Sequence, residues 1–494
     1  MSRRERPYLF YGATRALCST CFVVCDAKEL IQGDKVYLWK RCLEHGVQRV
    51  LLSDDVEYFR LCREVFLKPP EQVEKYNTKT EWGCPYDCGI CPDHEQHGCV
   101  SVLEITDFCN LRCPTCFAAS GPHRETHRSM AQIERMLDRM VANEREPDVV
   151  QISGGEPTLH PQIFEILDAC RARPIRHLML NTNGIRIAAE DGFAERLAAY
   201  QPGFEIYLQF DSLHDDVNTH LRGATLSHVK QQALDRLNAL NLSTTLVVTL
   251  KKGFNDDQIG EILAFAAKQR AVRGVTLQPV QDSGRNEAYD PVAHRLPLSE
   301  VRRRLYQQSA VFTPADIVPV PCDPDMVAMG YAIRDADDFT RLTPLTRYVP
   351  ADVLINAGKN TIIYEDDKAL IGAAAMQIFK TFSTAHGPEG ASRALGDLLC
   401  CLPRVEQAPG LTYDRVFRVI IMQFLDHHAM DLRSVRKSCV HIAHPDGERM
   451  IPFDTYNIFY RDALETERLM PIRRRIERAR GLAAGGSMLP MATA

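Results

Sequence analysis

The feature that most constrains the fold is a regular alternation of short apolar, strand-like segments with helical segments between residues 101 and 285. Six short runs rich in Val, Ile and Leu have the length of buried β-strands: 101–106, 148–153, 177–182, 204–210, 243–250 and 274–280. Helical stretches lie between them, near 129–144, 160–172, 187–200, 226–240 and 256–270. Strands that alternate with helices pair in parallel through right-handed crossovers. The pattern predicts an α/β domain, either a partial (βα)6 TIM-type barrel or an open doubly wound sheet.

The rest of the chain divides around this domain, to which we assign residues 101–295. Residues 1–80 are expected to form a small β-rich metal-binding module, and 81–100 a loop dense in Cys, Pro, Gly, Asp and His. Residues 296–480 are expected to form a mostly helical C-terminal domain, whose clearest element is an amphipathic helix over 414–432. The tail 481–494 is expected to be disordered.

Composition and charge limit which partners and which location can be expected for the chain. The formal net charge is −5, which gives no reason to expect nucleic acid as a partner. No window approaches the roughly 20 apolar residues of a membrane span, and no apolar signal segment follows the charged N-terminus. We therefore expect a cytoplasmic protein without a membrane span. The oligomeric state is not predicted.

Cysteine is the one unusual residue type. The chain has 17 cysteines, and most lie between Cys18 and Cys116 in closely spaced groups. An odd number without a secretory signal indicates metal ligands before disulfides. Cys62 and Cys170 are exceptions, because they fall in predicted helices and are expected to be core residues.

Three of the cysteines follow the first predicted strand with the spacing C-x3-C-x2-C: Cys109, Cys113 and Cys116. Three thiolates from one short loop can hold three irons of a [4Fe–4S] cluster, which leaves the fourth iron open. On spacing alone, a structural cluster or a zinc site with a remote fourth ligand is the alternative.

Polar or glycine-rich residues follow the other strands of the domain. They include Gly154, Gly155, Glu156 and Pro157 after the second strand, Asn183 after the third and Gln209 at the fourth. Barrel enzymes assemble their sites at these strand ends. Glycines let the backbone approach a ligand closely, and a carboxylate can accept from an ammonium group. The register of these residues with the cysteine loop favours one shared site over unrelated turns.

The cysteine loop and the Gly-Gly-Glu-Pro motif together resemble the radical S-adenosylmethionine (SAM) superfamily. The resemblance implies that Cys109, Cys113 and Cys116 are the catalytic residues that bind the cluster, whose open iron chelates SAM. It implies a cofactor-binding role for the residues at the strand ends, with Glu156 and its glycines at the methionyl ammonium and Asn183 and Gln209 toward the ribose. Reductive cleavage of SAM would give a 5′-deoxyadenosyl radical that abstracts a substrate hydrogen. The electron would come from a donor such as flavodoxin or ferredoxin.

Two further groups of cysteines precede the domain. One comprises Cys84, Cys88, Cys91 and Cys99, whose four thiolates suit an auxiliary [4Fe–4S] cluster or zinc, with His94 and His97 as alternative ligands. The other comprises Cys18, Cys21, Cys42 and His45, a knuckle pair of the zinc-ribbon or rubredoxin type in which Cys25 could replace His45. Ligand types alone do not decide between iron and zinc.

The whole set of motifs is similar to the group that contains the archaeal tetraether lipid synthase and the methanopterin-precursor methylase. The similarity implies a C-terminal auxiliary cluster, and Cys322 and Cys439 match two of its ligands. The third position is Asp454, where the group has cysteine, which leaves assembly of that cluster open; Cys400 and Cys401 are nearby alternatives.

These observations predict a radical SAM enzyme of the transferase or oxidoreductase type, acting by methylation or C–C bond formation. A lipid would need a long apolar groove and a pterin a compact polar pocket, and the sequence does not decide between these substrates. A radical SAM peptide maturase is the alternative enzyme. An iron–sulfur electron carrier is the non-enzymatic alternative.

Overall fold

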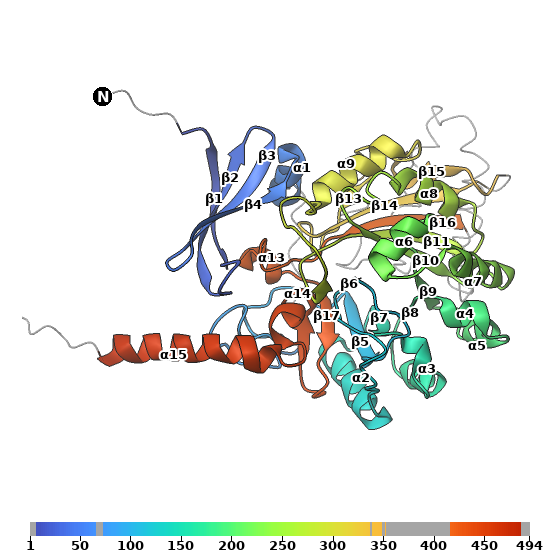
Figure 1. The fold of residues 1–494 in the computed structure, drawn as a ribbon, viewed down its shortest axis with the longest axis horizontal. Helices are drawn as coiled ribbons and strands as arrows, with labels where there is room; N and C mark the ends of the chain where they lie inside the picture. The colour runs from blue at the N-terminus through green and yellow to red at the C-terminus, as the bar shows by residue number, and fades with distance from the viewer. Residues whose placement is uncertain (1–5, 66–72, 336–337, 348–350, 352–414, 486–494) are drawn as a thin grey trace, which may run out of the picture.

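The computed structural model describes residues 6–65, 73–335, 338–347, 351 and 415–485, and two sheets organise them (Figure 1). The first is an antiparallel four-stranded sheet in chain order, made of β1 (Leu9–Leu17), β2 (Val24–Gln32), β3 (Lys35–Cys42) and β4 (Gly46–Ser53). Alternate residues of β3 are buried, as expected for a strand with one covered face. Helix α1 (Val56–Arg60) and the π-helical turn η1 (Leu61–Val65) follow. The expected β-rich N-terminal module is confirmed.

The second sheet contains the six predicted parallel strands. They are β5 (Val100–Thr106), β7 (Val149–Gly154), β8 (His177–Thr182), β9 (Phe204–Gln209), β10 (Thr244–Leu250) and β11 (Val272–Pro279). Each pairs in parallel with the next along the chain. A doubly wound sheet would reverse its strand order at a switch point. Because this order never reverses, the partial barrel is the correct alternative.

Helices connect these strands and cover one face of the sheet (Figure 1). They are α2 (Met130–Glu144), η2 (Pro157–Leu159), α3 (Ile163–Arg171), α4 (Ile185–Ala189), α5 (Phe193–Ala198), α6 (Asp215–Arg222), α7 (Ser227–Ala239) and α8 (Ile259–Ala267). Ser129 and Gln132 form a capping box at the start of α2. The helix expected over 187–200 is divided by Gly192, whose φ of +78° is left-handed. Helix α6 was not expected.

The C-terminal region begins with α9 (Leu298–Gln308) and adds strands to the same sheet. They are β13 (Val318–Pro319), β14 (Val327–Arg334), β15 (Leu342–Pro344), β16 (Val416–Met422), β17 (Val440–Ala443) and β18 (Met450–Pro452). Strand β16 pairs in parallel with β11, and β17 with β5. The sheet therefore continues past both ends of the six-stranded core.

The helix expected over 414–432 is wrong, because the segment forms β16 instead. Every residue of β16 after Val416 is buried. A strand covered on both faces has a continuous apolar run, which periodicity cannot distinguish from a buried helix. Its place between β11 and β14 explains the burial.

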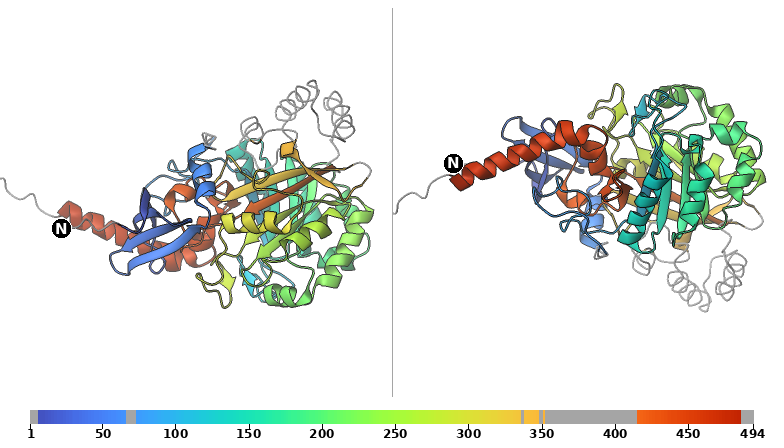
Figure 2. Two further views of the ribbon diagram at one scale, coloured as in Figure 1. Left: turned by 90° about the horizontal axis from the view of Figure 1, so that it is seen from above. Right: turned by 90° about the horizontal axis from the view of Figure 1, so that it is seen from below.

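The chain ends in a helical segment that extends along the N-terminal sheet (Figures 1 and 2). Its elements are α14 (Phe453–Thr455), η6 (Tyr456–Tyr460), η7 (Glu465–Leu469) and α15 (Met470–Gly485), whereas η3 (Leu345–Arg347) and α13 (Leu432–Val435) lie earlier in the chain. Arg475 of α15 pairs with Glu44 of the N-terminal module. Helix α15 includes the first residues of the segment 481–494, up to Gly485, and residues 486–494 lie outside the described residues, so disorder of the tail stays a prediction.

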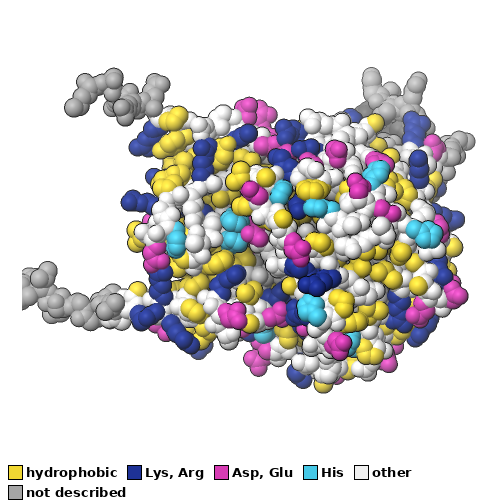
Figure 3. All heavy atoms as spheres, viewed as in Figure 1, with side chains coloured by type: hydrophobic (Ala, Val, Ile, Leu, Met, Phe, Trp, Pro, Cys, Tyr) yellow, Lys and Arg dark blue, Asp and Glu magenta, His cyan; other side chains and the backbone are white. Residues whose placement is uncertain are grey.

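The described helices include none that is long and apolar enough to cross a membrane. On the face drawn in Figure 3, acidic and basic side chains are interspersed. That mixture gives no single-sign patch on this face of the kind that attracts polyanions.

Candidate active site and metal centres

The C-terminal ends of the parallel strands open onto one cavity of about 200 Å³, enough for more than a single water molecule. Eight of the predicted site residues line it: Cys109, Cys113, Cys116, Gly154, Gly155, Glu156, Asn183 and Gln209. Pro157 begins the short helix η2 directly after them. The structure therefore brings together residues that were predicted from four separate segments of the chain.

The cysteine loop is held by contacts with a second loop. Strand β6 (Thr115–Cys116) pairs with β12 (Arg285–Asn286), and Arg285 donates to the carbonyls of Cys113 at 2.6 Å and Ser120 at 2.7 Å. Burial raises the pKa of the Cys109 thiol to about 12. A bound iron would supply the positive charge that holds such a thiol as thiolate. The donor set of three cysteines in a fixed loop fits the expected cluster.

The two glycines of the motif pack against the cysteine loop. A Cβ on Gly154 would overlap the Thr106 carbonyl oxygen, and one on Gly155 would overlap that of Phe108. Gly155 donates from its backbone N–H to Thr106 at 2.7 Å. The two glycines were expected to let the backbone approach a ligand. In this structure they let the backbone at the end of β7 pack against the start of the cluster loop.

The Glu156 carboxylate is buried and accepts four hydrogen bonds. The donors are the N–H and hydroxyl of Thr158, the Thr182 hydroxyl at 2.7 Å and the Asn183 N–H at 2.7 Å. A carboxylate has about four acceptor positions. Three of these donors share Oε1 and only Asn183 reaches Oε2, so Glu156 links the ends of β7 and β8 while its expected contact with the ammonium group stays a prediction.

Asn183 and Gln209 also have protein partners. The Asn183 amide donates to Asn110 of the cysteine loop at 2.7 Å and accepts from Ile185, the first residue of α4, at 3.0 Å. The Gln209 amide oxygen accepts from Arg222 at 2.8 Å in the orientation that satisfies both groups. Both residues line the cavity, so their remaining polar atoms can face a ligand.

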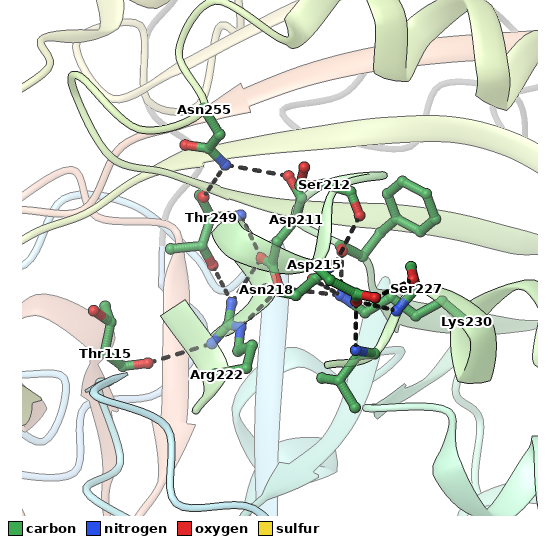
Figure 4. A network of polar contacts seen from close by, with 12 residues as sticks. Thr115, Asp211, Ser212, Asp215, Asn218, Arg222, Ser227, Lys230, Thr249 and Asn255 are labelled. Carbon is green, nitrogen blue, oxygen red and sulfur yellow. Dashed lines mark hydrogen bonds and ion pairs between the residues drawn. The ribbon is translucent and has the colours of Figure 1, made fainter. Parts of the chain in front are cut away.

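A buried ion pair that the sequence analysis missed lies beside the cysteine loop (Figure 4). Arg222 donates to both carboxylate oxygens of Asp211 at 2.7 Å and to the Thr115 carbonyl at 3.3 Å. Burial tends to raise the pKa of Asp211, but the Arg222 guanidinium holds it below its usual value. Lys230 lies 3.6 Å from the same carboxylate. No sequence motif identifies Arg222. It lies at the end of α6, the helix that follows the strand carrying Gln209.

The N-terminal module brings its four predicted ligands together. The ligand atoms of Cys18, Cys21, Cys42 and His45 all lie within 4.8 Å of one another. The Cys25 thiol instead faces the Ala16 carbonyl at 3.5 Å. Two cysteine knuckles with a histidine form the tetrahedral donor set of a mononuclear site.

The remaining cysteines form two groups that differ from the expected ones. Cys84, Cys88 and Cys91 lie close together, because their thiols influence one another's pKa. The pKa of Cys84 is raised to about 12, first by burial and then by the Cys91 thiol. Burial and both other thiols raise the pKa of Cys88. The Cys99 sulfur lies within 4.8 Å of those of Cys322 and Cys439. Cys99 therefore lies beside cysteines other than those with which the sequence grouped it, and its grouping with the loop cysteines stays a prediction.

The other residues considered as ligands have defined places or lie outside the described residues. Asp454 lines the cavity and accepts from the Leu425 N–H at 2.6 Å and the Ser438 hydroxyl at 2.9 Å. His94 contacts the Ser438 carbonyl at 3.1 Å and His441 at 3.0 Å. Cys400 and Cys401 are not among the described residues.

Comparisons with known proteins agree with this geometry. Residues 103–266 match the radical SAM superfamily, and residues 10–54 match the HMPTM N-terminal zinc ribbon domain. The chain thus carries a radical SAM domain behind a zinc ribbon, and it is a radical SAM enzyme. Enzymes of this class use a [4Fe–4S] cluster and SAM.

Its full length is similar to one particular enzyme. 7,8-Dihydro-6-hydroxymethylpterin dimethyltransferase of Methanocaldococcus jannaschii is 27% identical over 491 residues, which cover 93% of this chain and 96% of that protein. Mycofactocin maturase MftC of Mycolicibacterium smegmatis is 29% identical over 204 residues, 41% of this chain and 49% of that protein. Streptococcus suis SuiB bound to S-adenosylmethionine gives a TM-score of 0.36 at 20% identity, over 42% of this chain and 46% of that one.

Proposed function

We propose that this enzyme methylates a small polar heterocycle of the pterin class by radical SAM chemistry. The observation that carries the proposal is the lining of the central cavity. Strands β7 to β11 contribute amide and hydroxyl side chains to it, namely Gln151, Asn181, Tyr207, Thr245, Thr276 and Gln278. A pterin ring carries several hydrogen-bond donors and acceptors, and such a lining can pair with them. Apolar side chains such as Met179, Val247 and Ile420 line the cavity too, as in most small-molecule pockets, and the amides would fix the orientation of the ring.

Two more features of the cavity favour a flat polar ligand. Phe117, Phe424 and Phe453 line it, with the last two rings stacked at 3.9 Å between centroids, and aromatic faces suit a planar ring. Arg418 also lines the cavity and donates to Glu205 at 2.6 Å. A charged pair in the wall makes this part of the cavity polar, which suits a polar substrate better than an alkyl chain.

The cofactors divide the work within this proposal. The cluster held by Cys109, Cys113 and Cys116 and its SAM would supply a 5′-deoxyadenosyl radical that takes a hydrogen from the substrate. A second SAM would provide the methyl group and leave as S-adenosylhomocysteine, with a second electron from the donor completing the step. The protein would orient the substrate through the cavity amides and keep the cysteine loop in place through Glu156 and Arg222. Cys84, Cys88 and Cys91 are proposed to hold an auxiliary [4Fe–4S] cluster that relays electrons from a flavodoxin- or ferredoxin-type donor.

Two other functions are weaker. The peptide maturase MftC covers less than half of this chain, and this chain spans about half of its length. The pterin enzyme, by contrast, matches the zinc ribbon and the C-terminal region as well. An electron carrier needs no SAM domain. A chain with many free cysteines suits a reducing compartment. We therefore propose the cytoplasm as its location.

The test is an anaerobic incubation of the reconstituted enzyme with SAM, dithionite and 7,8-dihydro-6-hydroxymethylpterin. Mass spectrometry should detect a pterin that has gained one or two methyl groups. Gln278→Leu and Tyr207→Phe should lower the yield, whereas Gln231→Leu, on the exposed face of α7, should not. Formation of 5′-deoxyadenosine without any change in the pterin, but with methylation of an added lipid or peptide, would contradict the proposed substrate class.

A further inference from the structure

Three cysteine sulfurs from three distant segments converge at the start of β5, and a histidine nitrogen lies beside one of them. The sulfurs of Cys99, Cys322 and Cys439 all lie within 4.8 Å of one another, and those of Cys322 and Cys439 are 3.6 Å apart. The Nε2 atom of His97 lies 3.7 Å from the Cys99 sulfur. The three cysteines are buried, and only 13% of the His97 side chain is exposed.

The spacing of the three sulfurs is that of ligands which share one ion, whereas His97 does not lie within 4.8 Å of all three. A tetrahedral zinc with Zn–S bonds of about 2.3 Å places its sulfurs about 3.8 Å apart. In the N-terminal module, the sulfurs of Cys21 and Cys42 are 3.8 Å apart and His45 Nδ1 lies 3.5 Å from Cys42. The cysteines of a cubane bind different irons and stand further apart.

The catalytic cysteines provide that contrast within the same molecule. The sulfurs of Cys109, Cys113 and Cys116 do not all lie within 4.8 Å of one another, and neither do those of Cys84, Cys88 and Cys91. The group at Cys99 therefore resembles the mononuclear site of the N-terminal module and differs from the two cysteine loops.

His97 is oriented as a metal-binding histidine usually is. Its Nδ1 contacts the Glu144 carboxylate at 3.2 Å, while Nε2 faces Cys99. The other Glu144 oxygen accepts from the Gly98 N–H at 2.9 Å, which fixes the carboxylate. A carboxylate on the far nitrogen sets the tautomer and the ring direction of a ligating imidazole.

A buried carboxyl group with one unpaired oxygen lies beside these ligands, and a cation there would stabilise its charged form. Asp323, next to Cys322, is only 3% exposed, and its Oδ1 has no hydrogen-bond partner among the described residues. An unpaired buried carboxylate is costly, and a nearby positive ion offsets that cost. Asp454, in contrast, already has two donors. Asp454, which stands where the similar enzymes have a cysteine, is thus not needed as a ligand of this ion.

The place of the group in the fold indicates a structural role. Cys99 and Cys439 directly precede β5 and β17, and the Val100 N–H donates to the Cys439 carbonyl at 3.1 Å. The group is therefore at the N-terminal end of β5, opposite the catalytic loop. In barrels, that end contributes to stability rather than to catalysis.

We infer that Cys99, Cys322 and Cys439 bind a single zinc ion in place of a third [4Fe–4S] cluster, and that His97, which now reaches only Cys99, turns toward the ion to complete a tetrahedral site. The ion would join the loop before β5, the segment after β13 and the start of β17. The inference is independent of the proposed substrate, since it concerns ligands remote from the SAM motif.

The test counts zinc, iron and acid-labile sulfide in the anaerobically purified full-length holoenzyme. A cubane holds equal iron and sulfide, so metal in excess of sulfide counts mononuclear ions. The wild type should show an excess of about two ions per chain. Cys322→Ser and His97→Ala should each lose about one, with iron and sulfide unchanged. Cys170→Ser, a buried thiol elsewhere in the core, should retain both.

Two results would overturn the inference. One is an excess of about one ion in the wild type, which leaves only the N-terminal site occupied. The other is a loss of about four irons with four sulfides in Cys322→Ser, which identifies a cubane. Because Cys322→Ser is a buried change, zinc X-ray absorption on the wild type provides a second measurement. It should show an average shell of three sulfurs and one nitrogen, and a purely sulfur or oxygen-rich shell would contradict the site.

Discussion

Arg222 and Asp211 form a buried ion pair beside the catalytic cysteine loop, with both carboxylate oxygens 2.7 Å from guanidinium nitrogens. The same guanidinium donates to the Thr115 carbonyl within that loop. The pair therefore links the end of β9 to the segment that carries Cys113 and Cys116. Since both charges are removed from water, each is stabilised mainly by the other.

Asp211→Asn should destabilise the protein strongly, because it leaves the Arg222 charge buried without its partner. We expect a loss of about 3–5 kcal/mol in the free energy of unfolding, measured by chemical denaturation. Asp191→Asn is the matched control, since Asp191 pairs with Arg236 while 97% exposed and should change stability by less than about 1 kcal/mol. Equal losses in the two variants would contradict the role of burial.

Gly155→Ala should prevent assembly of the catalytic cluster. Its Cβ would overlap the Phe108 carbonyl, so β7 and the cysteine loop must separate. We expect a lower iron and sulfide content after reconstitution and no spectral change on adding SAM. Gly481→Ala has no neighbouring atom within 4 Å of its Cβ and should behave as the wild type. Full cluster content in Gly155→Ala would count against this close packing.

Much of the core could be predicted from the sequence, because each buried parallel strand is a compact apolar run followed by polar residues. The six strands and the gathering of Gly155 and Asn183 with the cysteine loop follow from that pattern. The strand at Val416–Met422 could not be recognised, since burial on both faces removes its period. The partners of Cys99 also escaped prediction, because Cys322 and Cys439 reach it only through long-range pairing of β17 with β5.

The N-terminal module should bind its ion through His45 and not through Cys25. His45 Nδ1 lies 3.5 Å from the Cys42 sulfur, whereas the Cys25 thiol faces a backbone carbonyl. His45→Ala should therefore weaken metal retention during dialysis against a chelator, and Cys25→Ser should not. The reverse order of the two variants would assign the fourth ligand to Cys25.

Stability should rise with pH above 8 because of Lys40. This buried side chain donates to the carbonyls of Leu17 and His428, and burial lowers its pKa to about 8. In the unfolded chain a lysine keeps a pKa of about 10.4. Between these values the unfolded state binds more protons, so the free energy of unfolding increases with pH. The cost of the buried charge is present below pH 8 and disappears above the unfolded pKa.

The measurement is the difference in unfolding free energy between the wild type and Lys40→Met as a function of pH. It should shift in favour of the wild type as pH rises from 8, by about 3 kcal/mol over the whole window. Lys28→Met, on the exposed face of the neighbouring strand β2, should give a constant difference. A constant difference for Lys40→Met as well would show that its ammonium is not perturbed by burial.

The central claim is that Cys109, Cys113 and Cys116 hold the cluster that cleaves SAM. It is tested most directly by measuring 5′-deoxyadenosine after anaerobic reconstitution with SAM and dithionite. The wild type should form it, and Cys113→Ala should form none although it keeps the iron bound by the other sites. Cys62→Ser, a buried thiol outside every metal group, should match the wild type. Absence of 5′-deoxyadenosine with the fully reconstituted wild type, or equal formation by Cys113→Ala, would contradict the account.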